Sequence, residues 1–537
     1  MRRGFIVFAA AFGLAAGPVR GGAEAAEPAA ASPTQVALHK LQQDAAVAEI
    51  LGGLQHGAPA GVVILRDVQV VDPLAESVAS KQSVIVSNGK IAWVGGVGEE
   101  PKLPDARVIE GSGRFVAPGL TDMHVHASAA DGWLLDLAAG VTAVRDMAGF
   151  PWMLEARERI NARRMLAPAL SVAGPLINGY AMEGYSVVPA SPADARRIVR
   201  QEAACGYDFI KVHNIVPGPI FDAVNEQAKA LGIDVVGHVP HHVTVRHAVE
   251  SGMRTMEHLK GFIDDATLKP GETDFPAAAG KDVWNTPTLY AGRGYARGEE
   301  ARKLLSAPEM RYAPLRKRVA WSRALDQPEG RGDALGREAQ PIMKTIVGEL
   351  HRAHAQFLAG TDADNYPFQV MGFALVEEMR LLQEAGLSPA EAMRAATSEP
   401  ARALKEPLEF GQIQKGMRAD LVILDTNPLR DAAAYRANRG VMAHGFWLSR
   451  EDLDAALAKL EKIEAEPDAA VDASRPAVSA LVSRVKALAA GGFVFSAPRL
   501  TALADLVRVD GANDAVDELK ALARIRNDGP CADYRPR

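Results

Sequence analysis

The chain contains very little cysteine. Its 537 residues include two, Cys205 and Cys531, and neither belongs to a C-x-x-C pair. A zinc site built on cysteine thiolates is therefore excluded. In an exported protein the two residues can form one disulfide, and otherwise they remain free thiols. The sequence alone leaves both states open.

An excess of positive charge is also missing. Lys and Arg number 60 against 66 Asp and Glu, which gives a formal net charge of −6. A protein that binds the phosphate backbone of a nucleic acid needs a basic face. We therefore expect a small-molecule or peptide substrate and no nucleic-acid partner. Whether the chain forms a homo-oligomer stays open.

Two further absences make some classes of protein less plausible for this chain. Beyond the N-terminus no apolar run is long enough to cross a bilayer, so we expect no membrane span. The G-x-S-x-G sequence that places the nucleophile of many serine hydrolases is absent as well. This disfavours serine hydrolase chemistry.

Residues 1–26 have the pattern of a secretory signal peptide. Arg2 and Arg3 precede the apolar stretch FIVFAAAFGLAAG, and small residues around Ala23 to Ala25 offer an A-x-A cleavage site. We therefore expect export, to the periplasm or outside the cell. The arginine pair also resembles a twin-arginine signal faintly, but an ordinary signal peptide is favoured.

The rest of the chain divides into regions that differ in the period of their hydrophobic pattern. Residues 27–60 are rich in Ala and have a helical period, which predicts an exposed N-terminal helix. Residues 61–116 and 405–450 alternate apolar and polar residues, and SNGK at 87–90 supplies an Asn-Gly hairpin turn. These two blocks predict one small β-domain made from both flanks of the centre. Residues 451–537 predict a helical extension.

The central region, 117–404, alternates short apolar runs with helical stretches. This pattern predicts βα units, and eight strands over this length fit a (β/α)8 barrel of the α/β class with a charged, helix-prone insertion at 291–350. The expected strands are 119–125, 141–146, 169–173, 208–213, 234–239, 254–258, 283–289 and 356–361.

Histidines and an aspartate stand at the ends of several of these strands. His124 and His126, in APGLTDMHVH, are two apart in a strand, so both imidazoles project to one face and can bind one cation. His238, His258 and Asp362 follow the fifth, sixth and eighth strands. Because the carboxyl ends of barrel strands share one rim, we expect these groups to converge on a metal site.

Lys211 ends the apolar run of the fourth strand, FIKV. A buried ammonium is costly, so its pKa should fall unless a carboxylate compensates it. One interpretation is an ion pair with a nearby carboxylate. The other is a neutral amine that has become a carbamate and bridges two metal ions.

Taken together, these motifs resemble the amidohydrolase superfamily, in its imidazolonepropionase-like and prolidase-like (Xaa-Pro dipeptidase-like) branch. APGLTDMHVH is similar to the first-strand signature, and FIKVH, GHVP, MEHLKG and LAGTDAD are similar to the motifs of strands four, five, six and eight. GKIAWVGG and GQIQKGMRADLVILDTNPL resemble the two halves of the family's β-sandwich. The similarity covers about residues 60–450.

The resemblance implies a metal centre with one or two ions, with Zn²⁺ as the expected metal. One ion would be bound by His124, His126, Lys211 and Asp362, and the second by carbamylated Lys211, His238 and His258. Asp362 would also be the catalytic residue, which takes a proton from the metal-bound water and passes it to the leaving nitrogen. The number of ions depends on whether Lys211 is carbamylated.

The resemblance also implies a metal-dependent hydrolase that cleaves an amide bond of a peptide or N-acyl amino acid. A cyclic-amide hydrolase or deaminase on the same site is one alternative, and a catalytically inactive periplasmic binding or scaffold protein is another. Candidate substrate contacts on the rim are His213 and Tyr290 first, then Tyr180, Arg145 and His241.

Overall fold

The computed structural model describes ten stretches of the chain. They are residues 31–58, 61–126, 130–182, 186–263, 274–280, 282–325, 331–363, 365–468, 471–509 and 513–523. The expected signal peptide at 1–26 and Cys531 lie outside these residues. Among the described residues, no helix combines the length and the apolar character needed to cross a membrane.

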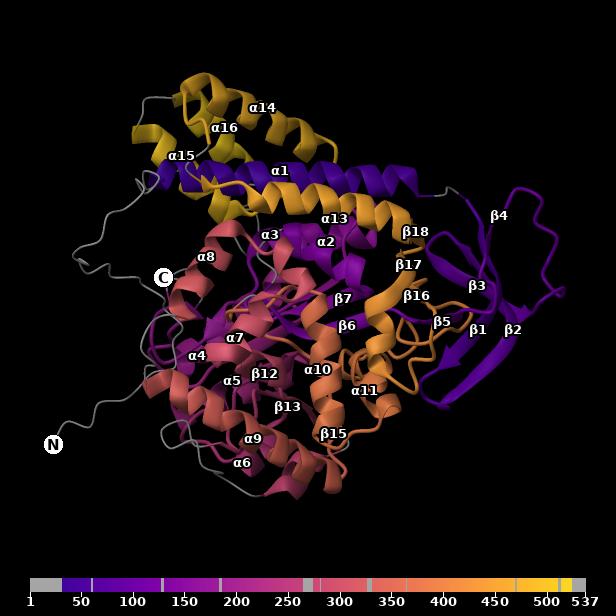
Figure 1. The fold of residues 1–537 in the computed structure, drawn as a ribbon. Helices are drawn as coiled ribbons and strands as arrows, with labels where there is room; N and C mark the ends of the chain where they lie inside the picture. Colours follow the sequence, from indigo (N-terminus) through magenta and orange to yellow (C-terminus); the bar gives the residue numbers. More distant parts are fainter. Residues whose placement is uncertain are drawn as a thin grey trace.

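Parallel strands form the centre of the molecule (Figure 1). One sheet has three strands, β6 (Leu120–Val125), β7 (Val141–Asp146) and β8 (Ala169–Val172). A second has seven, in the order β10 (Ser186–Val187), β9 (Leu176–Ile177), β11 (Phe209–Val212), β12 (Asp234–Gly237), β13 (Met253–Glu257), β14 (Trp284–Thr286) and β15 (Gln356–Phe357). Isolated parallel bridges link each sheet to a segment next to the other, one between Val125 of β6 and Ala363, which lies beyond β15, and the other between Ala173, which follows β8, and Phe209 of β11.

All eight expected strands are present, with ends that differ by a few residues from the prediction. They are β6, β7, β8, β11, β12, β13, β14 and β15. The short strands β9 and β10 were not predicted, because two-residue strands carry no measurable periodicity. The fold is therefore of the mixed α/β class.

Helices alternate with these strands, and local signals in the sequence set their ends. Ser191 accepts a hydrogen bond from the Asp194 amide and so begins α4, while Gly206, at φ 87°, ends it in the left-handed conformation that glycine tolerates best. The helices of this region are α2 (Ala130–Ala139), α3 (Pro151–Asn161), α4 (Pro192–Cys205), α5 (Gly218–Leu231), α6 (Val245–Ser251), α10 (Phe373–Glu384), α11 (Pro389–Ala395) and α12 (Ser398–Ala403).

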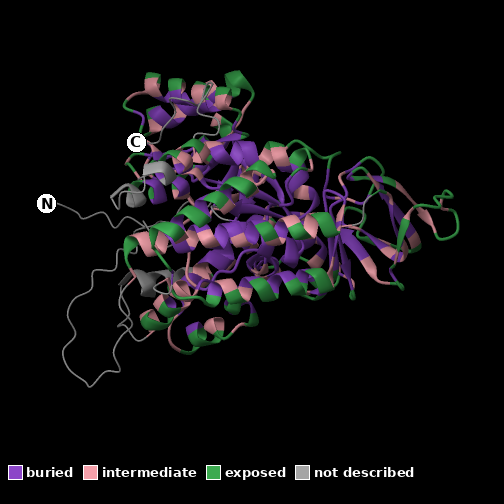
Figure 2. Cartoon of the chain, turned by 90° about the horizontal axis from the view of Figure 1, so that it is seen from above, coloured by how far each residue is buried: buried purple, intermediate pink, exposed green. Residues whose placement is uncertain are grey.

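The described part of the insertion at 291–350 is largely helical, as its composition predicted. It contains most of η2 (Leu289–Tyr295), all of α7 (Gly298–Leu305), η3 (Pro308–Tyr312) and α8 (Leu315–Leu325), and most of α9 (Arg331–Arg352). The short 3₁₀ helix η1 (Phe275–Ala279) precedes it. Figure 2 shows that buried residues concentrate in the central strands and on the inward faces of the surrounding helices.

A third sheet contains strands from both flanks of the central region. Its order is β18 (Phe446–Ser449), β17 (Asn438–Ala443), β16 (Leu421–Leu424), β5 (Phe115–Pro118), β1 (Val63–Asp72), β2 (Ser77–Ser87) and β3 (Lys90–Gly96), with β4 (Arg107–Glu110) also paired to β1. The antiparallel pairing of β5 with β16 joins segments about 300 residues apart in the chain. At the β2–β3 hairpin, Asn88 and Gly89 have φ angles of 51° and 79°, which confirms the predicted Asn-Gly turn.

The prediction that the N-terminal helix is exposed was wrong. Helix α1 (Pro33–Gly57) packs against α13 (Arg450–Ala465), α14 (Arg475–Ala490) and α15 (Ala497–Val509), next to α16 (Asn513–Ala523) (Figure 1). Leu38 and Leu41 are fully buried in a hydrophobic cluster with residues of the C-terminal helices. The Asp44 carboxylate forms a buried ion pair of 2.6 Å with Arg499. Most of the helices that cover α1 come from the far end of the chain, so local periodicity did not reveal its burial.

Cys205, at the end of α4, is disulfide-bonded. The chain has one other cysteine, Cys531, which lies outside the described residues.

We predict that Leu41→Ala destabilises the protein by about 2–5 kcal/mol, because it opens a cavity between α1 and the C-terminal helices. Leu408→Ala is the matched control, since Leu408 is 77% exposed and its loss should change stability by less than about 0.5 kcal/mol. Urea unfolding of both variants checks this. Equal midpoints for Leu41→Ala and the wild type would contradict the packing of α1.

Candidate metal centre

The predicted metal ligands lie at the carboxyl ends of parallel strands. His124 is the second-to-last residue of β6, and His126 directly follows that strand. Lys211 is in β11, His238 directly follows β12, His258 directly follows β13, and Asp362 lies beyond β15. Neighbouring parallel strands end at the same edge, so the fold brings these side chains together as predicted.

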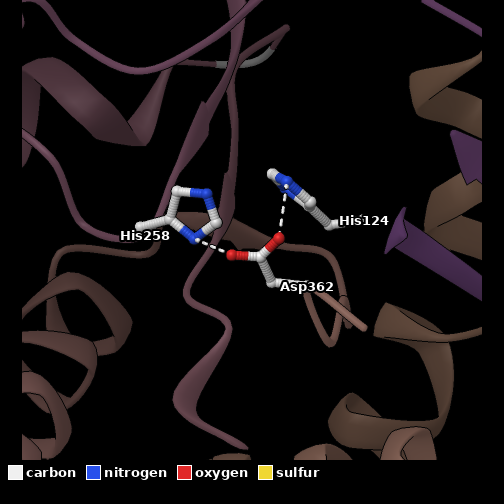
Figure 3. A group of neighbouring side chains, drawn as sticks. All are labelled: His124, His258 and Asp362. Carbon is white, nitrogen blue, oxygen red and sulfur yellow. Dashed lines mark ion pairs between the residues drawn. The ribbon is translucent and has the colours of Figure 1, made fainter. Parts of the chain in front are cut away.

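Asp362 lies between the histidines of β6 and β13. Its Oδ1 is 3.1 Å from His126 Nε2 and 3.6 Å from His124 Nε2, and its Oδ2 is 3.8 Å from His258 Nδ1. One ligand atom from each of His124, His258 and Asp362 can be chosen so that all three lie within 4.8 Å of one another (Figure 3). That spacing suits a single cation bound between them.

The imidazoles form a continuous row around this point. The ring centroids of His124 and His258 are 4.5 Å apart, and those of His258 and His238 are 4.7 Å apart in an edge-on arrangement. The His238 ring is in turn 4.2 Å from that of His213. His213, a predicted substrate contact, thus lies directly beside the predicted ligands.

Burial keeps these imidazoles neutral, as metal ligands must be. It lowers the pKa of His124 to about 4 and holds the pKa values of His238 and His258 well below the usual range for histidine. In the part of the chain that the structure describes, the buried atoms His124 Nε2 and His126 Nδ1 have no hydrogen-bond partner. Buried polar atoms are almost always paired, so unpaired imidazole nitrogens beside a carboxylate fit the donor set of a divalent metal.

Asp362 carries a negative charge at this site. Burial alone would raise the pKa of its carboxyl group, but His258 and His124 outweigh that effect and hold it below the usual range. The Asn365 side chain donates a hydrogen bond of 2.9 Å to Asp362 Oδ1. Asp362 itself has a φ of 56°, an unusual backbone conformation for a residue with a side chain.

Lys211 is 1% exposed, and burial lowers the pKa of its ammonium group to about 8, although Glu257 and Asp362 act in the opposite direction. A lysine in water keeps its proton up to pH ~10. The amine of Lys211 is therefore available in its neutral, nucleophilic form much closer to neutral pH.

A buried carboxylate that the sequence analysis missed lies behind the ligands. Glu257 is fully buried, and its Oε2 accepts a hydrogen bond of 2.8 Å from His124 Nδ1. Burial alone would raise its pKa, but Arg145 and His124 hold it below the usual range. The only signal in the sequence was its place directly before His258 in MEHLKG.

Arg145 was predicted as a substrate contact, and this prediction was wrong. It is 1% exposed and donates a hydrogen bond of 2.8 Å to Glu257 Oε1 and another of 2.6 Å to the Met123 carbonyl oxygen. All six residues of β7 are buried, so the period of the sequence does not separate a side chain in the core from one beside the site. Arg145 therefore supports the site from within the core.

The remaining histidines and tyrosines lie in other surroundings. The Tyr290 hydroxyl is buried and donates a hydrogen bond of 3.1 Å to the Phe368 carbonyl oxygen. His241 is exposed, and Tyr180 is half-buried. His351 is half-exposed and pairs with Glu391 at 3.0 Å, as expected for a surface residue.

Comparison with known proteins agrees with this geometry. The family model of the Amidohydrolase family matches residues 342–472. An imidazolonepropionase from Anaeromyxobacter dehalogenans (strain 2CP-C) is 26% identical over 407 residues, which are 68% of this chain and 90% of the relative.

Two solved structures are similar over most of the chain. A bottromycin amidohydrolase aligns with a TM-score of 0.66 and 25% identity over 79% of this chain and 95% of its own. A putative prolidase from Bifidobacterium longum aligns with a TM-score of 0.59 and 24% identity over 74% of this chain and 99% of its own, a likeness of fold. The chain is therefore similar to the amidohydrolase superfamily, in its imidazolonepropionase-like and prolidase-like branch, and this similarity supports a hydrolase that acts on carbon–nitrogen bonds.

Proposed function

We propose that the protein is a metal-dependent hydrolase that cleaves the amide bond of a dipeptide or an N-acyl amino acid. The observation that carries the proposal is the convergence of His124, His258 and Asp362 at one end of the parallel strands. Within the described residues, His124 Nε2 and His126 Nδ1 are buried there without a hydrogen-bond partner. A site of this kind is costly unless a cation completes it.

The proposed ligands divide between two ions, with Zn²⁺ as the metal. His124, His126, Lys211 and Asp362 would bind one, and carbamylated Lys211, His238 and His258 the other. A divalent cation bound here would lower the pKa of a bound water toward ~7 and polarise the scissile carbonyl group.

The chain's own residues would perform the proton transfers. Asp362 is held deprotonated by its histidine neighbours, so it can accept a proton from the attacking water through one carboxylate oxygen. The same carboxyl group then donates that proton to the leaving nitrogen, which departs as an amine. Asp362 returns to its starting state, and water supplies both the hydroxyl of the new acid and the proton of the amine.

Carbamylation of Lys211 is part of the proposal. The neutral amine nitrogen attacks the carbon of carbon dioxide, a C–N bond forms as one C–O π bond opens, and the nitrogen releases one proton to water, which leaves a carbamate with one negative charge. Burial supports this step because it lowers the pKa of Lys211 to about 8.

The two predicted substrate contacts remain proposals. His213 supports such a role, since its Nδ1 atom is buried without a hydrogen-bond partner among the described residues and its ring lies beside His238. Tyr290 lies in η2, where its backbone amide donates a hydrogen bond of 2.7 Å to Glu378 and so fixes its position.

We also propose a domain organisation and an exported location. The bridges Val125–Ala363 and Ala173–Phe209 support closure of the parallel strands into a (β/α)8 barrel over residues 117–404. The mixed sheet supports a β-sandwich domain formed by residues 61–116 and 405–450, with a helical segment at 27–60 and a helical extension at 451–537. Export to the periplasm or the medium rests on the signal pattern in residues 1–26 alone.

A substrate screen tests the function. Purified protein loaded with Zn²⁺ is incubated with a library of dipeptides and N-acyl amino acids, with cyclic amides as a second set because of the similarity to imidazolonepropionases. We expect cleavage of linear amides that stops after treatment with a chelator and returns with Zn²⁺. Cleavage of cyclic amides alone would overturn the substrate class, and no turnover in either set would favour an inactive binding or scaffold protein.

We predict that Asp362→Asn lowers kcat at least about 100-fold while the protein stays folded, because the amide keeps the shape of the carboxylate but cannot accept the proton. Asp222→Asn is the matched control, since Asp222 is a half-exposed residue of α5 that pairs with His247. Steady-state kinetics and circular dichroism on both variants check this. Substantial activity in Asp362→Asn would remove the role given to this residue.

For Lys211 we predict a change in metal stoichiometry. Wild-type protein reconstituted with Zn²⁺ and bicarbonate should hold two ions per chain, whereas Lys211→Met should hold at most one, because the bridging carbamate is lost. Elemental analysis after gel filtration measures the ratio, with Lys229→Met, an exposed lysine of α5, as the control. Two ions in Lys211→Met would contradict the carbamate.

A further inference from the structure

Glu257 has a set of contacts that joins the metal centre to the buried core. It is fully buried at the end of β13, and its two carboxylate oxygens face different partners. Oε2 accepts a hydrogen bond from His124 Nδ1 at 2.8 Å, and Oε1 accepts one from Arg145 Nη2 at 2.8 Å. The Thr255 hydroxyl donates to Oε1 as well.

These contacts determine which nitrogen of His124 carries the proton. A carboxylate that faces a guanidinium group can only accept hydrogen bonds. His124 must therefore donate from Nδ1, which leaves a lone pair on Nε2. That nitrogen is the atom 3.6 Å from Asp362 Oδ1, and it has no hydrogen-bond partner within the described residues.

His258 and His238 have the same arrangement with neutral acceptors. The Thr288 hydroxyl donates its proton to the Pro287 carbonyl oxygen at 2.8 Å, so towards His258 Nδ1, at 2.7 Å, it acts as an acceptor. His238 Nδ1 contacts the side-chain oxygen of Asn214. In all three histidines Nδ1 faces an oxygen of another side chain. Of these three acceptors, Glu257 is the one with a charge.

We propose that Glu257, held in place by Arg145, is a positioning residue of the metal centre that fixes the orientation and tautomer of His124 and strengthens its Nε2 as a ligand. A charged acceptor on the far nitrogen of an imidazole makes the near nitrogen a better electron donor, and residues of this kind commonly contribute 10–100-fold to metal affinity. The inference rests on the metal-binding part of the proposed function and needs no assumption about the substrate.

Arg145 makes this arrangement rigid. Besides Glu257 it donates to the Met123 carbonyl oxygen at 2.6 Å and to the Thr255 hydroxyl at 3.0 Å. The guanidinium group of Arg145, in β7, therefore connects the backbone beside His124, in β6, to the carboxylate of Glu257, in β13. A buried ion pair could instead serve stability alone, so the experiment has to separate metal affinity from folding.

The test measures Zn²⁺ affinity by competition with a chromophoric chelator. Glu257→Gln keeps an acceptor of nearly the same shape but removes the charge, and we expect 10–100-fold weaker Zn²⁺ binding per folded chain. The Co²⁺-loaded variant should also show a changed visible spectrum, because the ligand geometry around the ion is altered. Loss of packing alone would change neither quantity in the folded fraction.

Glu378→Gln is the matched control. Glu378 is another fully buried glutamate, and it accepts hydrogen bonds from the amides of Leu289 and Tyr290 rather than from a predicted ligand. Its loss should leave Zn²⁺ affinity within about twofold of the wild type. Equal weakening in both variants, or wild-type affinity in Glu257→Gln, overturns the proposal.

If Glu257→Gln does not fold because Arg145 is left unpaired, Glu257→Asp takes its place. It keeps a charge for Arg145 but shortens the side chain by one methylene, which withdraws the carboxylate from His124, so weaker Zn²⁺ binding is again expected. Unchanged affinity in that variant overturns the proposal. A wild-type protein that binds Zn²⁺ tightly but cleaves no amide would refute the proposed function and leave this inference standing, whereas a wild type that binds no divalent metal refutes both.

Discussion

Charges buried in the core must be compensated by other charges, and this constraint organises the centre of the protein. Lys211, Arg145, Glu257 and Asp362 are all at most 5% exposed, and they are two cations and two anions. Each ion alone would cost several kcal/mol to desolvate. The parallel strands can hold them because the carboxylates face either a guanidinium group or imidazoles.

The same constraint connects metal binding to the proposed carbamylation of Lys211. A divalent cation brought into this balanced group adds two positive charges, and conversion of one ammonium to a carbamate removes two. The proposed carbamylation thus offsets the charge of one of the two proposed ions. Neutral histidines contribute lone pairs to such a site without adding charge, which explains why burial of His124, with its depressed pKa, suits the role.

The sequence predicted the parts of this site that depend on position along strands. The sequence predicted that these side chains converge because residues at strand ends share one edge regardless of the details of packing. They are His124, His126, Lys211, His238, His258 and Asp362. The sheet made from both flanks was found in the same way, from the alternation in 61–116 and 405–450. These features follow from period and order alone.

What escaped prediction depends on the direction of a side chain and on contacts distant in sequence. Glu257 reaches a histidine 133 residues earlier in the chain. Arg145 has the same period as its neighbours and yet lies in the core. Helix α1 has a helical pattern from which its burial could not be inferred, since the covering helices α13, α14 and α15 follow at the opposite end of the chain.

The packing of α1 and the pairing of β5 with β16 have a consequence for how the protein acquires its structure. Both connect the first quarter of the chain to the last. As the polypeptide leaves the ribosome, neither the helical cluster nor the mixed sheet can be completed until residues beyond 420 and 475 have been made. Contacts so far apart in sequence slow folding, and in the meantime Leu38, Leu41 and the edge of β5 are left without their partners. Completion of the fold therefore depends on the segments that are made last, and a chain truncated before them would leave these surfaces uncovered.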